Sequence, residues 1–163
     1  MLNSKRLTYH FLSESNRKDY IELSMNAEVM RYITGRPLSY EEAGARFDKN
    51  LQVIANQPGT GSMAVHLKSN GHFIGCGKVV YLEDGRIEIG YSLLPPFWGQ
   101  GYGSEIAQAC IQYARTLHTH ELMAITDPVN RPSIKILERL GFELYKTGDY
   151  FGLPAAFFKH PLG

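Results

Sequence analysis

Apolar residues recur at intervals of three and four along several stretches of the chain, which is the pattern of helices with one buried face. The clearest stretch is 40–56, where Ser39 and Glu42 have the S-x-x-E spacing of a capping box. Residues 28–33 are also apolar and either extend the first helix or begin another. The pattern and its end signals predict helices from Ser13 or Ser15 to about 26, and over 40–56, 103–118 and 130–141.

Elsewhere apolar and polar residues alternate, which is typical of half-buried strands. This alternation predicts strands over 6–11, 63–67, 73–81, 87–94, 122–126, 142–145 and 155–160. Asn70-Gly71 separates two of them, and both residues tolerate the positive φ of a type I′ turn. Residues 62–94 should therefore form a three-stranded antiparallel meander, and 155–160 should close the sheet as an antiparallel pair with 142–145.

The strand over 122–126 follows a helix, so it should lie parallel to its neighbour. A meander that feeds a strand–helix–strand unit indicates an α/β (α+β) fold. We expect one domain, 1–163, with a mixed, mostly antiparallel central sheet and flanking helices. At this length the chain can bury about 70% of the surface that its unfolded form exposes.

Composition narrows the class of partner. The net charge of +1 gives no drive toward nucleic acid. Cys76 and Cys110 lie in apolar stretches without a CxxC spacing, and the six histidines do not cluster, so we expect buried free thiols and no metal site. The chain offers neither an apolar signal-peptide core nor a run of about 20 apolar residues. These features predict a cytoplasmic protein with no membrane partner.

The most informative segment is the glycine-rich stretch 97–104, between a predicted strand and a predicted helix. Gly99, Gly101 and Gly103 alternate there. Glycines let the backbone approach a ligand closely, and a helix N-terminus adds a partial positive charge. The stretch is therefore expected to bind phosphate oxygens.

Other phosphate loops fit this stretch less well. A Walker A loop needs a lysine after its glycines, whereas Tyr102, Gly103 and Ser104 follow Gly101. A dinucleotide loop needs GxGxxG near the start of a parallel sheet, and the chain has GxGxG after a meander. A structural turn without a ligand is the remaining interpretation, although three alternating glycines would then serve no purpose.

Segments 88–95 and 98–105 together resemble the acyl-CoA-binding motif of the GNAT superfamily, and especially of its RimJ/RimL branch of N-terminal acetyltransferases. Segment 130–142 is similar to the second motif of that branch, and segments 5–7 and 27–30 to its N-terminal pattern. The resemblance covers nearly the whole chain. It implies a sheet in which two parallel strands splay apart where one bulges, with acetyl-CoA as the co-substrate.

The resemblance also implies which residues hold that co-substrate. Backbone groups of Leu93 and Leu94 would contact the pantetheine, and Asn130 would reach its amides. The pyrophosphate would lie in the loop formed by Trp98, Gly99, Gln100, Gly101, Tyr102, Gly103 and Ser104.

Two residues are predicted to be catalytic. Glu88 matches the base of the family, and its alternation with Ile87 and Ile89 places it on the opposite strand face. The competing interpretation is a surface or salt-bridged strand glutamate. Ser133 would stabilise the leaving thiolate, or it would simply cap its own helix. Many relatives place a tyrosine as general acid where this chain has Leu137, so the acid is open, and Tyr91 or Tyr102 could supply a hydroxyl.

The predicted activity is transfer of an acetyl group from acetyl-CoA to a primary amine, by direct attack in a ternary complex. The alternative is a non-catalytic acyl-CoA-binding or sensing module, which Leu137 favours. ATP binding is a third interpretation, and the missing lysine argues against it. A protein N-terminus, an antibiotic, a polyamine and a small amine all stay open as acceptors, which segments 28–40 and 146–156 should contact. A homodimer is compatible with the sequence.

Overall fold

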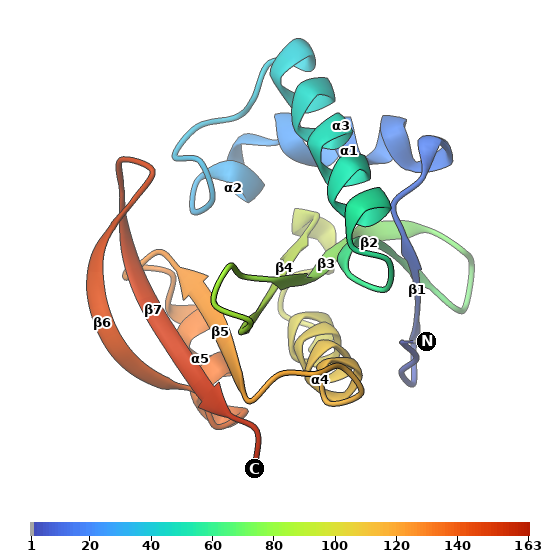
Figure 1. Cartoon of the computed structure of the whole chain (residues 1–163). Coiled ribbons are helices and arrows are strands. Elements are labelled where there is room, and N and C mark those ends of the chain that lie inside the picture. Colours follow the sequence, from blue (N-terminus) through green and yellow to red (C-terminus); the bar gives the residue numbers. More distant parts are fainter. Residues whose placement is uncertain (1) are drawn as a thin grey trace.

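The computed structural model describes residues 2–163 and contains one seven-stranded sheet in the order β1-β2-β3-β4-β5-β7-β6 (Figure 1). Every neighbouring pair of strands is antiparallel except β4 and β5. The elements are β1 (Leu7–Phe11), the 3₁₀ turn η1 (Glu14–Asn16), α1 (Arg17–Met25), α2 (Ala27–Met30), α3 (Tyr40–Asn56), β2 (Gly61–Leu67), β3 (Phe73–Tyr81), β4 (Ile87–Leu93), the 3₁₀ turn η2 (Pro95–Phe97), α4 (Tyr102–Ala114), β5 (Glu121–Thr126), α5 (Arg131–Arg139), β6 (Glu143–Tyr150) and β7 (Leu153–Pro161). The predicted mixed, mostly antiparallel fold is confirmed.

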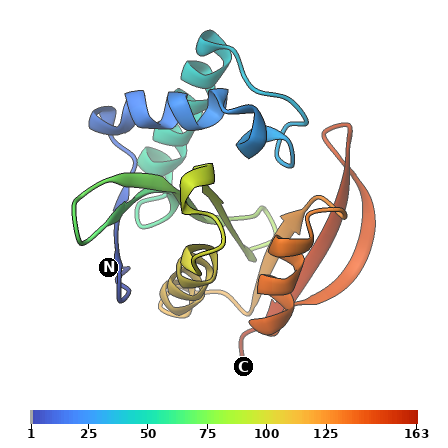
Figure 2. The ribbon, with the colours of Figure 1, turned by 180° about the vertical axis from the view of Figure 1, so that it is seen from behind.

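Helices cover both faces of the sheet, with α1, α2 and α3 on one side and α4 and α5 on the other (Figures 1 and 2). Successive side chains of each strand point to opposite faces of the sheet, so they pack against different layers of helices. In β2, for example, Ala64 packs with Phe47 of α3, whereas Met63 and Val65 join the larger cluster around Ile106 of α4. Cys76 and Cys110 are buried free thiols, as predicted, and burial raises the pKa of each to about 12.

Most predicted elements form within a few residues of their expected bounds. The capping box at Ser39 and Glu42 is present, and α3 covers 40–56 as expected. Helix α4 ends at Ala114 rather than near 118, because the chain turns there to enter β5. Strand β6 reaches Tyr150 rather than 145, because its pairing with β7 persists across a register shift between Leu144 and Lys146.

The predicted type I′ turn at Asn70-Gly71 is wrong, although the hairpin itself is present. Gly71 has a φ of 74°, but Asn70 does not share its positive φ. Five residues, 68–72, connect the strands, and the Gly71 N–H donates to the Leu67 carbonyl at 2.8 Å. The longer loop leaves Gly71 as the one residue of the pair that needs the left-handed conformation.

The parallel strands β4 and β5 determine where a ligand can enter the sheet. They pair at only two positions, Ile87 with Leu122 and Glu88 with Met123. Beyond Glu88, β4 follows β3 to Leu93 and β5 follows β7, so the two strands diverge (Figure 1). The expected splay is therefore present. The expected bulge is not, because the register of β4 with β3 is regular from Ile87 to Leu93.

Candidate active site

The glycine-rich loop follows the end of β4 and leads into α4. Gly99 and Gly101 have φ values of 72° and 83°, which residues with a side chain rarely adopt. Gly103 serves a different purpose, since a Cβ there would lie 3.1 Å from Ile136 Cδ1 and 3.6 Å from Tyr91 Cε2. Two of the glycines therefore shape the loop, and the third lets α4 approach β4 and α5.

The loop presents a run of free backbone donors. None of the N–H groups of residues 99–104 has an acceptor among residues 2–163, and Gly101 caps α4 without a side-chain hydrogen bond. The first N–H groups of a helix are unsatisfied unless something caps them, and they attract anions. The run of donors fits a pyrophosphate, as the sequence predicts for this segment.

Arg6 of the N-terminal segment anchors the loop from a distant part of the chain. Its guanidinium lies 4.2 Å from the centre of the Tyr102 ring, and its Nη1 donates to the Gln100 carbonyl at 3.0 Å. Its Nε donates to Glu105 Oε2 at 2.7 Å, and its backbone N–H donates to Glu105 Oε1 at 2.7 Å. Burial raises the pKa of Glu105, but these hydrogen bonds outweigh it and the pKa is lowered. Glu105 therefore stays ionised and holds Arg6 against the loop.

The C-terminal end of β4 borders the gap that opens where β5 diverges from it. Leu94 donates its N–H to the Ile74 carbonyl at 2.8 Å, and its own carbonyl accepts from Phe97, so its N–H is not free for a ligand. Successive residues of a strand bond to opposite sides, so Leu93 turns its backbone toward the open edge. The Trp98 indole N–H donates to the Leu93 carbonyl at 2.8 Å, and Gln100 Nε2 donates to Pro96. Leu93 thus keeps its N–H for a ligand.

Glu88 lies at the last position where β4 and β5 pair, and it is buried. Its Oε1 accepts from Lys78 Nζ of β3 at 2.5 Å. The Lys78 stem lies across Gly90, where a Cβ would be 3.2 Å from Lys78 Cε. The interpretation of Glu88 as a salt-bridged strand residue is confirmed, and its position where the strands divide leaves the role of base as a prediction. Sequence reasoning missed Lys78, which lies ten positions away on another strand.

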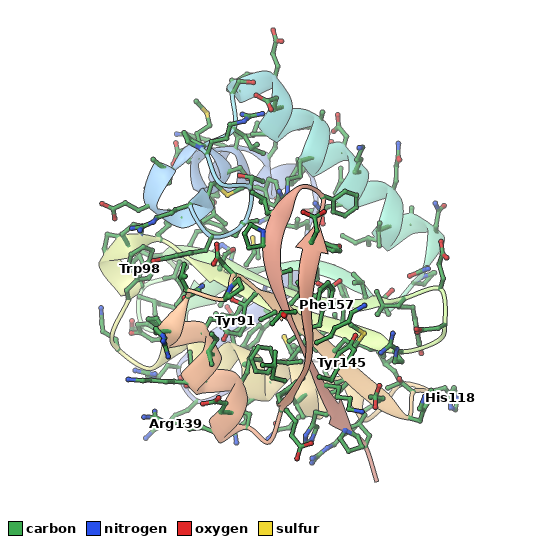
Figure 3. All side chains as sticks on the ribbon, turned by 90° about the vertical axis from the view of Figure 1, so that its left-hand side faces the viewer. Tyr91, Trp98, His118, Arg139, Tyr145 and Phe157 are labelled. Carbon is green, nitrogen blue, oxygen red and sulfur yellow. The ribbon has the colours of Figure 1, made fainter. Side chains whose placement is uncertain are left out.

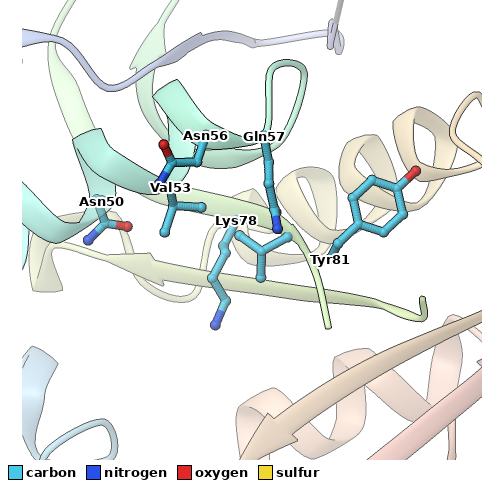
Figure 4. Close-up of a pocket in the computed structure, with 7 residues that line it drawn as sticks. Asn50, Val53, Asn56, Gln57, Lys78 and Tyr81 are labelled. Atoms are coloured by element: carbon cyan, nitrogen blue, oxygen red, sulfur yellow. The ribbon is translucent and has the colours of Figure 1, made fainter. Parts of the chain in front are cut away.

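Lys78 also lines a cavity of about 350 Å³ between α3 and β3 (Figure 4). The amides of Asn50, Asn56 and Gln57 line it as well, with Tyr81. Val53 and Val80 add apolar side chains, so the cavity beside Lys78 is of mixed polarity.

A pair of hydroxyls lies on the other face of β4. The Tyr91 hydroxyl is 3.1 Å from Ser133 Oγ in the first turn of α5. Burial raises the pKa of Tyr91 to about 12, with the Ser133 hydrogen bond opposing it, so the phenol stays protonated and can donate. Figure 3 shows Tyr91 beside α5. The sequence singled out both residues separately, but only the fold brings them together.

The remaining predicted residues have mixed surroundings. Asn130 Oδ1 accepts from the Ser133 N–H at 3.4 Å, so Asn130 caps α5, and its Nδ2 has no acceptor among residues 2–163. Leu137, at the position where the resemblance implies an acid, is buried in the main cluster. Within residues 2–163 no group of three His, Cys, Asp or Glu side chains could hold a metal ion. No helix in the same part of the chain is long and apolar enough to cross a membrane.

Comparison with known proteins agrees with this geometry. The uncharacterized N-acetyltransferase p20 of Bacillus licheniformis is 28% identical over 145 residues, which span 87% of this chain and 82% of the relative. An acetyltransferase from Agrobacterium tumefaciens superposes with a TM-score of 0.84 at 23% identity, covering 99% of this chain and 94% of that one. RimL, a ribosomal L7/L12 alpha-N-protein acetyltransferase in complex with coenzyme A, superposes with a TM-score of 0.80 at 20% identity over 98% and 96% of the two chains. Residues 6–143 match the family described as an acetyltransferase (GNAT) domain, and the chain therefore belongs to the GNAT acetyltransferase family.

Proposed function

We propose that the protein transfers an acetyl group from acetyl-CoA to a primary amine, which attacks the thioester directly in a ternary complex. One observation carries the proposal: the free donors of residues 99–104 lie just beyond the edge where β4 and β5 diverge. A pyrophosphate and an extended pantetheine arm need these two features side by side. We also propose the RimJ/RimL-like branch, supported by segments 98–105 and 130–142, and a cytoplasmic setting, supported by the two free thiols.

Each part of the site has a role in this proposal. The N–H groups of Gly99 to Ser104 bind the pyrophosphate, and the Leu93 N–H and Asn130 Nδ2 bind the pantetheine amides. Bound acetyl-CoA supplies an activated acetyl thioester. As the new N–C bond forms and the C–S bond breaks, Glu88 takes the proton from the amine, directly or through water.

The Tyr91–Ser133 hydroxyl pair supplies the general acid that Leu137 cannot. Tyr91 donates to the sulfur that leaves, and Ser133 holds the phenol in place or donates in its turn. A tyrosine on β4 thus fills the role that many relatives give to a tyrosine on the helix. This arrangement favours an enzyme over a non-catalytic acyl-CoA-binding module.

The proposal is tested by binding and by turnover. Acetyl-CoA at 100 times its Kd should stabilise the fold by about 2.7 kcal/mol, which raises Tm, since a ligand that binds only the folded state must do so. A panel of amines should release free thiol from acetyl-CoA. Stabilisation without release from any amine would favour the sensing module, and competition by ATP would favour a nucleotide site.

Replacing Tyr91 with phenylalanine should lower kcat by about 10²- to 10³-fold and leave the Kd for CoA within about twofold, because one donor to the developing thiolate is lost. Ser133→Ala should have a smaller effect. The double variant should resemble Tyr91→Phe alone if the serine acts through the tyrosine. Steady-state kinetics of the four proteins measure this coupling, and strictly additive losses would show that the two hydroxyls act independently.

A further inference from the structure

The peptide unit between Gln100 and Gly101 is the part of the glycine-rich loop that the loop itself supports least. Turning this unit over changes the φ of Gly101, and glycine adopts positive and negative φ at similar energy. No backbone N–H among residues 2–163 donates to the Gln100 carbonyl, and the Gln100 side chain donates to Pro96 instead. The loop alone therefore leaves the orientation of this unit open.

Arg6, in the segment that leads into β1, supplies the missing donor. Its Nη1 donates to the Gln100 carbonyl at 3.0 Å, across 94 positions of the chain. Residues 2–163 contain no cis peptide bond, and in a trans unit the C=O and the N–H point in opposite directions. Because the carbonyl is held toward Arg6, the Gly101 N–H points to the other side, where no group of the described residues accepts from it. One side-chain hydrogen bond thus sets the direction of a free donor.

Several contacts hold Arg6 itself in place. Its guanidinium lies 4.2 Å from the centre of the Tyr102 ring, and Nη2 lies 3.4 Å from the position of a Cβ on Gly101. The Glu105 carboxylate accepts from Arg6 Nε and from Ser4 Oγ, each at 2.7 Å. Glu105 also balances the charge of Arg6, whose side chain is 41% exposed, so the pair adds little attraction for an anion. The effect of Arg6 on the loop is therefore mainly geometric.

We infer, on the basis of the proposed function, that Arg6 is a positioning residue for the pyrophosphate of acetyl-CoA. It keeps the Gln100–Gly101 peptide unit in the orientation that presents the Gly101 N–H to the phosphate oxygens. Without the guanidinium the unit turns over, and the Gln100 carbonyl oxygen then faces the anion and repels it. This role depends on the phosphates, because a thioester without them gains nothing from the orientation.

Two acetyl donors with the same thioester test this inference. S-acetylpantetheine has the pantetheine amides of acetyl-CoA but no phosphate. Arg6→Met keeps an apolar stem and removes the donors, and we expect its KM for acetyl-CoA to rise at least about 10-fold with kcat within about twofold, because a hydrogen bond to a charged group is lost. Its kcat/KM for S-acetylpantetheine, taken from the first-order range, should change less than about twofold. The acceptor is the amine that gives the fastest thiol release.

Binding gives a second readout that needs no turnover. Calorimetric titration of Arg6→Met with CoA should show Kd raised by the same factor as KM. Arg6→Lys keeps the charge but has no planar fork to reach both Glu105 and Gln100. Its loss should be smaller and equally confined to acetyl-CoA and CoA, and this variant serves if Arg6→Met does not fold.

Arg17→Met is the matched control. Arg17 also lies over an aromatic ring, that of Phe47 at 4.7 Å, and it pairs with Glu14 and Asp48 at 2.7 Å, but it joins α1 to α3. We expect it to change the kinetics of neither acetyl donor. Equal losses for the two donors in the Arg6 variants, or an unchanged Kd for CoA, overturn the inference. Thiol release from no amine overturns the proposed activity, and the CoA titrations then still decide the role of Arg6.

Discussion

Replacing Glu88 with glutamine is expected to lower kcat for acetyl transfer by about 10²- to 10⁴-fold, which is the usual contribution of a positioned general base. The amide cannot take the proton from the attacking amine. Its Oε1 still accepts from Lys78, so most of the buried contact is kept. The Kd for acetyl-CoA should stay within about twofold, because the phosphate donors lie in another segment. Steady-state kinetics and calorimetric titration with acetyl-CoA measure these two quantities.

Glu121→Gln is the matched control for this substitution. Glu121 also lies on a central strand and also faces a cation, Arg86, but it stands at the start of β5, outside the proposed machinery. We expect its kcat to be unchanged. Equal losses in the two variants would point to a general electrostatic effect, and an unchanged kcat in Glu88→Gln would exclude Glu88 as the base.

Replacing Gly101 with alanine is expected to raise the Kd for CoA by about 10- to 100-fold. The residue has a φ of 83°, which costs alanine about 1–2 kcal/mol, and relaxation of that strain would turn the neighbouring N–H groups away from the ligand. The added Cβ would stand 3.4 Å from Arg6 Nη2, an ordinary van der Waals contact, so the expected effect comes from the backbone strain. Each charge-assisted hydrogen bond lost is worth about 1.5–3 kcal/mol. Calorimetric titration with CoA measures the change.

Gly85→Ala separates loop geometry from backbone strain. Gly85 lies in the β3–β4 turn with the same φ of 83°, and nothing is within 4 Å of its would-be Cβ. Both variants should lose a similar free energy of unfolding, but only Gly101→Ala should lose affinity for CoA. A loss of affinity in both would mean that strain alone weakens binding, and an unchanged Kd in Gly101→Ala would argue against the loop as the pyrophosphate site.

Several elements could be predicted from the sequence alone because they depend on residues that are close together along the chain. The capping box at Ser39 needs only four consecutive residues, and helix α3 follows from it. The glycine loop is also local, since the left-handed Gly99 and Gly101 and the helix start lie within a few positions. The prediction of a type I′ turn at Asn70 was wrong because the turn type is not a local property. It depends on how many residues the two paired strands leave between them, and that number is set by their register.

The sequence by itself determined the order of elements, the glycine-rich loop before a helix and the face on which Glu88 stands, because these depend on contacts within one turn or on the alternation of one strand. Only the tertiary structure decided what surrounds them. Arg6 reaches Glu105 across 99 positions, and Tyr91 meets Ser133 across 42. The second pair lies where β5 leaves β4 after two residue pairs and α4 and α5 pack on the same sheet face. No pattern along the chain specifies that divergence, since it arises from how seven strands share one sheet.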